Sequence, residues 1–202
     1  MKRIKAVREL RLASKSQGTV KLAAHPTRFH VENMPDGDSI IIPSVSSEKR
    51  QYIPIGILPP SAFASNLVLI IPNATLYHFG VLTSSVHMAW MRTVCGRLKS
   101  DYRYSKDIVY NNFPWPEETE TVLKEITKTA QVILDARNRY PDCSFADLYG
   151  ESMFLFPELL AAHQANDRAV LKAYGFSATM TEPEIVAELM KLYQKLTDSP
   201  KA

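Results

Sequence analysis

The sequence predicts an α+β fold: a mixed or antiparallel sheet with packed helices, followed by a small C-terminal helical bundle. Up to about residue 116, short apolar runs alternate with turn-forming residues, which is typical of strands. Beyond that point, apolar residues recur at three- and four-residue spacing, which is typical of amphipathic helices. The tripeptide PWP at residues 114–116 favours a rigid, extended connection between the two parts. We therefore expect a linker helix over residues 1–16, a first domain over residues 17–116 and a C-terminal helical domain over residues 117–202.

The N-terminal helix is expected from Met1 to about Ser14. Ile4, Val7 and Leu10 recur at three-residue spacing and form an apolar stripe, and basic residues surround it. Such a helix is solvated along its charged face, docks on another domain or approaches phosphate. The sequence leaves these three alternatives open.

Short strands and turns are expected from Gly18 onward. The run Ser39–Pro43 follows a tight-turn sequence and is predicted as a buried strand that ends at its proline. Gln51–Ile57 and Leu67–Ile71 are two further strand candidates. The second is apolar throughout, so we expect it at the centre of the sheet. Asn73–Thr83 is predicted as another strand.

Helices are expected on both sides of a last strand. Ser84 is the candidate N-cap of a helix whose apolar residues recur at four-residue spacing. The last strand is expected from Asp107 to Phe113. Three further helices are predicted at about residues 117–138, from residue 157 to residue 175, and from residue 181, where a capping-box sequence begins.

Charged residues alternate with other residues just before the predicted last strand. Arg97, Lys99, Asp101 and Arg103 fall on one side, and Leu98, Ser100, Tyr102 and Tyr104 fall on the other. A period of two predicts one extended strand with one face exposed to solvent and the other packed against the protein. A row of cations with one carboxylate offers several hydrogen-bond donors and one acceptor, which suits base edges and phosphates better than a protein core. We interpret this stretch as an edge that reads nucleic acid.

The net charge of +3 is distributed unevenly along the chain. Residues 1–116 contain 15 Lys and Arg against 7 Asp and Glu, a net of +8, whereas residues 117–202 contain 9 against 14, a net of −5. The basic part is the candidate surface for a polyanion. No apolar run reaches membrane-spanning length and the N-terminus has no apolar signal-peptide core, so we expect no membrane partner and a cytoplasmic location.

Sequence patterns of known catalytic, metal and cofactor sites do not occur in this chain. The two cysteines lack CxxC spacing, and glycine-rich cofactor loops, HExxH and GxSxG are missing from the sequence. We therefore expect no catalytic residue, no metal and no cofactor here. His78 and His87 have no nucleophile or carboxylate placed beside them by the sequence, so we expect both to be structural. A hydrolase that uses His87 or His163 is an alternative of a different class.

Several long segments are similar to one known family. They are FGVLTSSVHMAWMRTVCGRLKSDYRYS, IVYNNFPWP and, upstream, IPSVSSEKRQYIPIGIL. These segments resemble the target recognition domain of MmeI-like DNA methyltransferases, which are fused type II restriction-modification enzymes that methylate adenine. ILDARNRYPDCSFADLYG and PELLAAHQANDRAVLKAYGF resemble the C-terminal helical region of the same family. The resemblance covers nearly the whole chain.

The resemblance implies that residues 17–116 are the target recognition domain and that double-stranded DNA is the partner. The family's nuclease, S-adenosylmethionine pocket and catalytic Asn-Pro-Pro-Tyr motif lie in preceding domains, and this sequence matches none of them. The expected function is sequence-specific DNA recognition for an adenine-N6 methyltransferase domain in the same chain, without catalysis by this part. The alternative is a specificity or interaction subunit that acts in trans with a separate methyltransferase.

The family's base-reading positions correspond to Lys99, Asp101 and Arg103, and to Asn66 and Leu67 ahead of the apolar strand. On chemical grounds, Lys99 can donate to guanine O6 and N7 while Asp101 accepts from N4 of the paired cytosine, so the two would read one G·C pair. The alternative is an intramolecular ion pair between them, worth at most about 1 kcal/mol. Phosphate contacts are expected from Ser46, Ser47, Lys49, Arg50, Arg92 and Arg97.

Overall fold

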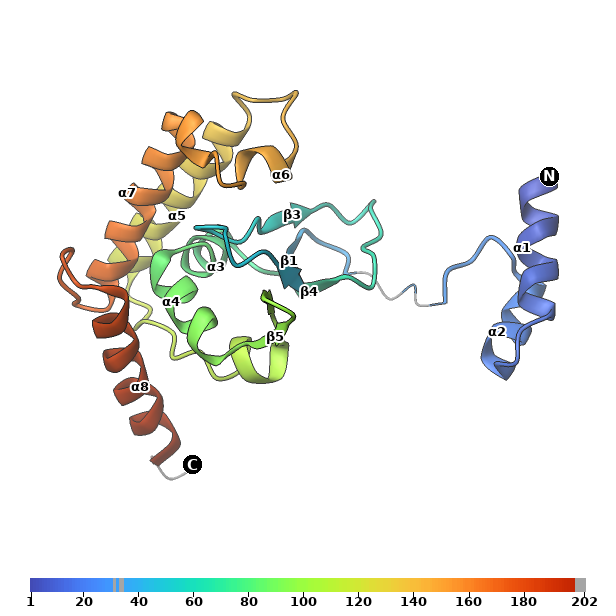
Figure 1. Ribbon diagram of the computed structural model, residues 1–202, viewed down its shortest axis with the longest axis horizontal. Coiled ribbons are helices and arrows are strands. Elements are labelled where there is room, and N and C mark those ends of the chain that lie inside the picture. Colours follow the sequence, from blue (N-terminus) through green and yellow to red (C-terminus); the bar gives the residue numbers. More distant parts are fainter. Residues whose placement is uncertain (31, 33–34, 199–202) are drawn as a thin grey trace. The chain divides into compact units, whose positions relative to one another are not determined.

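The computed structural model describes residues 1–30, 32 and 35–198, and the chain divides into two compact units, Met1–Asp36 and Gly37–Ala202 (Figure 1). The first unit is helical, and the second combines small antiparallel sheets with helices, which confirms the predicted α+β class. The first unit extends beyond the linker helix expected over residues 1–16. No helix of the described part is long and apolar enough to cross a membrane.

The first unit is built from short helices. These are α1 (Lys2–Leu12), α2 (Gln17–Lys21) and the 3-10 turn η1 (Leu22–Ala24). Helix α1 confirms the predicted N-terminal helix. The strands expected from Gly18 onward begin only at Ser39, because the side chain of Ser16 accepts a hydrogen bond from the Thr19 amide (3.4 Å) and caps a helix instead.

The first sheet of the second unit has three antiparallel strands in the order β3-β1-β4. They are β1 (Ser39–Pro43), β3 (Gly56–Leu58) and β4 (Val68–Pro72). Ile40 and Ile42 of β1 are each 1% exposed and belong to the core. Strands β1 and β4 confirm two predictions, but β4 is an edge strand and β1 is the central one. The strand predicted over Gln51–Ile57 shrinks to β3, because the chain makes a tight turn at Pro54.

The second sheet has the order β2-β6-β5 and is also antiparallel. Its strands are β2 (Val45–Ser46), β5 (Gly96–Leu98) and β6 (Asp101–Arg103). The chain passes from β1 to β2 through Ser44 alone. The two sheets are therefore joined at this residue.

Two predicted strands are wrong. Helix α3 (Leu76–Leu82) replaces the strand expected over Asn73–Thr83, and the π-helical turn η2 (Lys106–Tyr110) replaces most of the strand expected over Asp107–Phe113. Most apolar residues of these two segments, such as Phe79, Val81 and Val109, are buried against other elements instead. Capping residues favour helical turns in both segments. Thr75 forms a capping box with His78, and the Ser105 hydroxyl accepts a hydrogen bond from the Ile108 amide at 3.4 Å.

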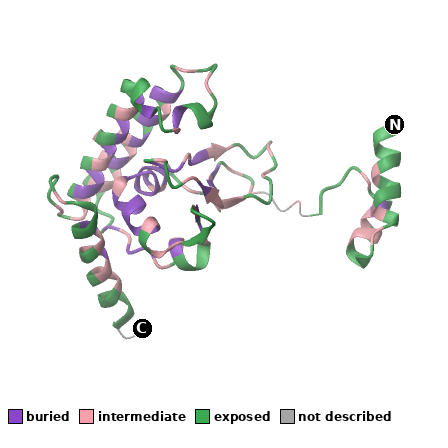
Figure 2. Cartoon of the chain, viewed as in Figure 1, coloured by how far each residue is buried: buried purple, intermediate pink, exposed green. Residues whose placement is uncertain are grey.

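Four of the remaining helices confirm the predictions. The remaining helices are α4 (Ser85–Val94), α5 (Glu120–Arg137), α6 (Phe145–Leu148), the 3-10 turn η3 (Met153–Leu155), α7 (Pro157–Ala173) and α8 (Glu182–Asp198). Helices α4, α5, α7 and α8 confirm the predictions, whereas α6 and the turn η3 were not predicted. Helix α5 packs against α7 and α3, while α8 packs on α4 (Figure 1). The buried faces of α3, α4, α5 and α7 meet (Figure 2), so the C-terminal helices share one core with the part that precedes them.

Candidate nucleic-acid interface

The alternating charged stretch forms a hairpin and not the single strand that its pattern predicts. Strands β5 and β6 pair Leu98 with Asp101 and Gly96 with Arg103, which leaves Lys99 and Ser100 as the turn. Lys99 has a φ of 56°, in the left-handed region, and this reverses the chain. The reversal has no strong signal in the sequence, because the turn contains neither glycine, proline nor asparagine.

The hairpin presents three charged side chains of the predicted reading edge. Asp101 and Arg103 share one face of β6, and Lys99 lies at the turn. Lys99 and Arg103 are exposed and Asp101 is half-buried. Among the described residues, none of these three side chains makes a hydrogen bond or ion pair, so the Lys99–Asp101 ion pair considered above does not form in this structure. Their hydrogen-bonding groups are available to a ligand.

The opposite face of the hairpin is fixed to the protein. Tyr102 and Tyr104 are 7% and 3% exposed, and the Tyr104 hydroxyl lies 2.9 Å from Nε2 of buried His87 on α4. Arg97 pairs across the hairpin with Tyr102 and places its guanidinium 4.1 Å from that ring's centroid. It also lies 3.8 Å from Glu48. Arg97 therefore supports the hairpin from the face opposite Arg103, which differs from the predicted row of charges on one side.

The second predicted reading segment lies beside the hairpin. Asn66 is exposed, and Leu67 is 67% exposed. The Leu67 carbonyl accepts from the amide of Ser44 (2.9 Å) and from its hydroxyl (2.8 Å). The Ser44 carbonyl in turn accepts from the Tyr104 amide at 2.9 Å, directly after β6. The structure thus brings the two segments, more than 30 positions apart in the sequence, to either side of one residue.

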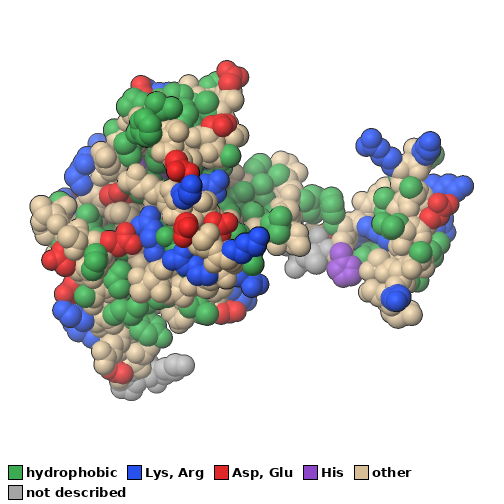
Figure 3. All heavy atoms as spheres, viewed as in Figure 1, with side chains coloured by type: hydrophobic (Ala, Val, Ile, Leu, Met, Phe, Trp, Pro, Cys, Tyr) green, Lys and Arg blue, Asp and Glu red, His purple; other side chains and the backbone are tan. Residues whose placement is uncertain are grey.

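The candidate phosphate contacts divide into accessible and internal groups. Ser46 is only 2% exposed and its hydroxyl accepts from Arg50 at 3.4 Å, so the structure places this predicted phosphate contact inside the protein. Ser47 is half-buried, and its hydroxyl accepts from the Lys49 amide at 3.3 Å. Lys49 is exposed and lies 2.9 Å from Glu151, whose carboxylate raises the pKa of the Lys49 ammonium. On the face of the larger unit drawn in Figure 3, Lys and Arg side chains are interspersed with acidic ones.

Arg92 holds protein elements together. Its guanidinium donates to Glu182 at the start of α8 (2.7 Å) and to the Gln51 carbonyl (2.7 Å). These partners leave Arg92 as a bridge between α4, α8 and the loop before β3. Because Glu182 is 90 positions away in the sequence, local spacing contained no sign of this role.

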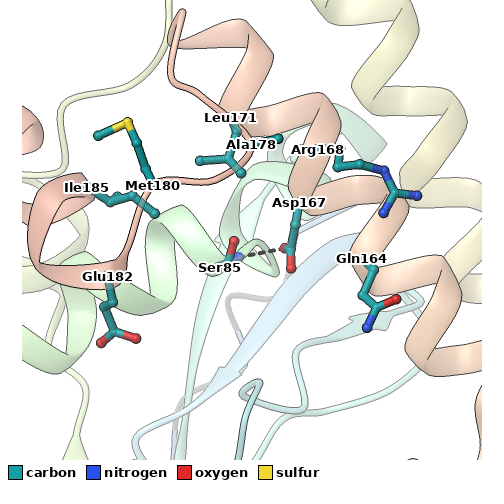
Figure 4. Close-up of a pocket in the computed structure, with 9 residues that line it drawn as sticks. All are labelled: Ser85, Gln164, Asp167, Arg168, Leu171, Ala178, Met180, Glu182 and Ile185. Atoms are coloured by element: carbon teal, nitrogen blue, oxygen red, sulfur yellow. Dashed lines mark hydrogen bonds between the residues drawn. The ribbon is translucent and has the colours of Figure 1, made fainter.

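A cleft of about 350 Å³ between α4, α7 and α8 is organised by Asp167 (Figure 4). Asp167 accepts from the Ser85 amide at the first turn of α4 (2.7 Å) and from the hydroxyl of Tyr52 (2.6 Å). Burial raises the pKa of this carboxyl. Both oxygens are occupied by these contacts, so Asp167 caps α4 and anchors the β2–β3 loop. No local sequence pattern indicates this role of Asp167, because its partners come from distant segments.

His87 and His163 lie in the core, and His78 lies at a helix terminus. His87 and His163 are both 0% exposed, and burial lowers the pKa of each to about 3. The Nε2 atom of His163 lies 2.8 Å from the Tyr149 hydroxyl, and His78 caps α3. The imidazoles of His87 and His163 each contact a buried tyrosine hydroxyl, so both side chains lie inside the core and not at a surface that a substrate reaches. Within the described ranges, no group of three or more His, Cys, Asp and Glu side chains is placed to hold a metal ion.

The fold and the hairpin correspond to a known protein family. A model of that family, described as "MmeI, target recognition domain", matches residues 1–117. The chain belongs to the MmeI target recognition domain family. A second model, "MmeI, C-terminal domain", matches residues 119–199, so the two together confirm the resemblance seen in the sequence over nearly the whole length.

This MmeI-type recognition region is similar to parts of two larger proteins. It is 39% identical over 196 residues to DNA methyltransferase A of Bacillus subtilis (strain 168), a match that covers 97% of this chain and 22% of the relative. It superimposes with a TM-score of 0.86 and 45% identity on the type IIL restriction-modification enzyme MmeI, whose structure was solved in complex with DNA. That match covers 97% of this chain and 26% of the enzyme, so this chain spans only a minor part of either relative.

Proposed function

We propose that this chain reads the base sequence of double-stranded DNA for an adenine-N6 DNA methyltransferase of a restriction-modification system. The observation that carries the proposal is the β5–β6 hairpin, which presents Lys99, Asp101 and Arg103 without a partner among the described residues. The major groove admits a two-stranded β-ribbon, and each base pair there has its own pattern of donors and acceptors. A hairpin with two cations and one carboxylate matches such a pattern.

Each exposed group has a chemical role in the proposed contact. Lys99 and Arg103 donate to guanine O6 and N7, and Asp101 accepts from the amino group of the paired cytosine. Asn66, on the neighbouring segment, can bond adenine through its amide, and Leu67 offers an apolar contact to a thymine methyl group. Lys49 and Arg50 hold phosphates nearby and contribute affinity without sequence information.

The similarity to MmeI supports DNA as the partner, because that enzyme was solved in complex with DNA. A methyltransferase domain, in the same chain or in a separate one, carries out the methylation in the cytoplasm. We expect S-adenosylmethionine to bind that domain; in this chain Gly18 and Gly80 lie in helices, and Gly56 and Gly96 lie in strands. Such positions do not build a cofactor cradle.

The proposal is tested by selecting duplexes from a random pool with the 202-residue chain and sequencing those that bind. We expect an enriched motif that contains a fixed G·C pair. Lys99→Ala should relax that position alone, at a cost of about 1–3 kcal/mol in discrimination. Lys128→Ala is the matched control, because Lys128 is an exposed lysine of α5 far from the hairpin in sequence.

Exchanging the charges of Lys99 and Asp101 tests for a changed base preference and not only for a loss of discrimination. Lys99→Glu together with Asp101→Arg keeps the net charge but interchanges donor and acceptor, so the preferred base at that position should change. An identical motif in this double variant would contradict direct reading by the pair. Binding without any enriched motif in the wild type would contradict the proposed function, and no binding at all would favour the interaction subunit that acts in trans.

A further inference from the structure

The positive charge of the protein belongs to its small N-terminal unit. Residues 1–36 contain 8 Lys and Arg against 3 Asp and Glu, a net of +5. This leaves 16 against 18 for residues 37–202, a net of −2. The hairpin therefore projects from a unit whose total charge repels a polyanion. Attraction to DNA over distance has to come from the first unit.

We call the surface of α1 that carries its four exposed cations the outer face of this helix. Lys2, Arg3, Lys5 and Arg8 are all exposed. Glu9 is the acidic residue of this helix, and it approaches Lys5 only to 3.9 Å. Within the described ranges, the side chains of Lys2, Arg3 and Arg8 make no ion pair. Six residues of α-helix rise about 9 Å, a length that spans roughly three phosphates along one DNA strand.

The cation that holds the small unit together is Arg11, and not one of these four. Its guanidinium donates to the carbonyls of Leu22 (3.1 Å), His25 (2.8 Å) and Arg28 (2.6 Å). Arg11 is half-buried and bonds to the segment that follows α2, whereas the other four cations are exposed. Figure 3 shows Lys and Arg side chains around this unit with few acidic ones among them. The outer cations are therefore free to serve a partner.

We infer that the outer face of α1 binds the phosphate backbone of the duplex whose bases the hairpin reads. This inference rests on the proposed function and assigns affinity and base discrimination to different units of the chain. The small unit supplies sequence-independent, salt-sensitive affinity through Lys2, Arg3, Lys5 and Arg8. The hairpin of the acidic unit supplies discrimination between base pairs. The four-to-one excess of cations over Glu9 favours DNA over a protein partner, although Leu10 and Leu12 on the same helix are 75% and 56% exposed.

The test measures how the affinity for random-sequence duplex depends on salt. The variant replaces Lys2, Arg3, Lys5 and Arg8 by Gln, which removes four charges and keeps a good helix former. Circular dichroism verifies that α1 persists. We expect the slope of log K against log salt to become shallower by about 2–3, with roughly tenfold weaker binding at physiological salt. The motif selected from random duplexes should remain the same, because the hairpin is intact.

The matched control removes four charges elsewhere. Lys124, Lys128, Lys172 and Lys191 are exposed lysines on α5, α7 and α8, and their replacement by Gln should leave the slope unchanged. Equal slopes for the α1 variant and the wild type would overturn the inference and point to a protein partner for α1. Equal losses in both variants would overturn it too, since total charge would then be the cause. Wild-type binding without a motif would contradict the proposed function alone, whereas absence of binding would contradict both.

Discussion

Lys99 combines a backbone conformation that suits glycine with the side chain that the proposed base contact needs. Its φ of 56° costs a residue with a Cβ about 1 kcal/mol or more. Lys99→Gly relieves this strain and also removes the ammonium group, while Lys99→Ala removes the ammonium group only. We predict that urea unfolding gives Lys99→Gly a free energy of unfolding about 1 kcal/mol above that of Lys99→Ala, with base discrimination lost in both. Retained discrimination in the glycine variant would show that the backbone, and not the ammonium group, is what DNA recognises.

His87 makes the stability of the larger unit depend on pH. Burial lowers its pKa to about 3 in the folded protein, compared with about 6.5 in an unfolded chain. The unfolded state therefore binds the proton first, so the contribution of His87 is complete above pH 6.5 and is lost as the pH falls toward 3. At pH 5 the loss amounts to about 2 kcal/mol. We predict that His87→Gln reduces the difference in unfolding free energy between pH 7.5 and pH 5 by about this amount, as measured by urea titration.

The His87 prediction has an internal control. His163 is equally buried and its pKa is lowered to about 3 by the same cause, so His163→Gln should reproduce the effect. Tyr104→Phe keeps the His87 imidazole and removes only the hydroxyl next to it, so the pH dependence should persist in that variant. A wild-type protein equally stable at both pH values would contradict the argument.

At the scale of elements, Asp167 determines how α4 begins. Its carboxylate accepts from the Ser85 amide and the Tyr52 hydroxyl, and it lies at the positive end of the α4 dipole (Figure 4). Asp167→Ala leaves two donors unsatisfied, so we predict a loss of about 2–4 kcal/mol in the free energy of unfolding. Asp167→Asn keeps one acceptor and should cost roughly half as much. An alanine variant at least as stable as the wild type would mean that desolvation of the carboxylate outweighs its hydrogen bonds.

Elements with strong local signals could be predicted from the sequence. The capping residue Ser84, the capping box that Thr181 opens and the proline at the end of Ser39–Pro43 all lie where the structure begins or ends an element. Residues 73–83 and 107–113 were mistaken for strands because aromatic and β-branched residues favour strands only when nothing else buries them. Here, packing against α5 and α4 buries them in helical turns instead.

The candidate site was predictable in its residues but not in its geometry. The family resemblance selected Lys99, Asp101 and Arg103, and the structure places all three on one hairpin. The pattern could not show that the chain reverses at Lys99, because alternation continues through a two-residue turn. Nor could it assign Arg92 to Glu182, since an ion pair between segments so far apart depends on the packing of α8 on α4.

At the scale of the larger unit, Gly80 tests whether the recognition sheets and the C-terminal helices form one cooperative structure. A Cβ on Gly80 would lie 2.5 Å from Cγ2 of Ile126 and 3.0 Å from Oδ1 of Asn166, so α3 approaches α5 and α7 this closely only because the residue is glycine. We predict that Gly80→Ala lowers the free energy of unfolding by about 1–3 kcal/mol, despite the better helix propensity of alanine. Gly18→Ala is the control, because the nearest atom to its Cβ is 3.6 Å away.

The unfolding curves of the Gly80→Ala variant also test whether the two regions that share the core unfold together. Trp90 and Trp115 lie in the part before α5, whereas α5, α7 and α8 contribute much of the helical signal, so tryptophan fluorescence and far-ultraviolet circular dichroism follow different regions. Because both regions contribute to one core, the two signals should change at the same urea concentration, and both midpoints should shift together in Gly80→Ala. Separate midpoints would mean that the helices beyond residue 117 are an independent domain. In that case the hairpin would not depend on them for its support.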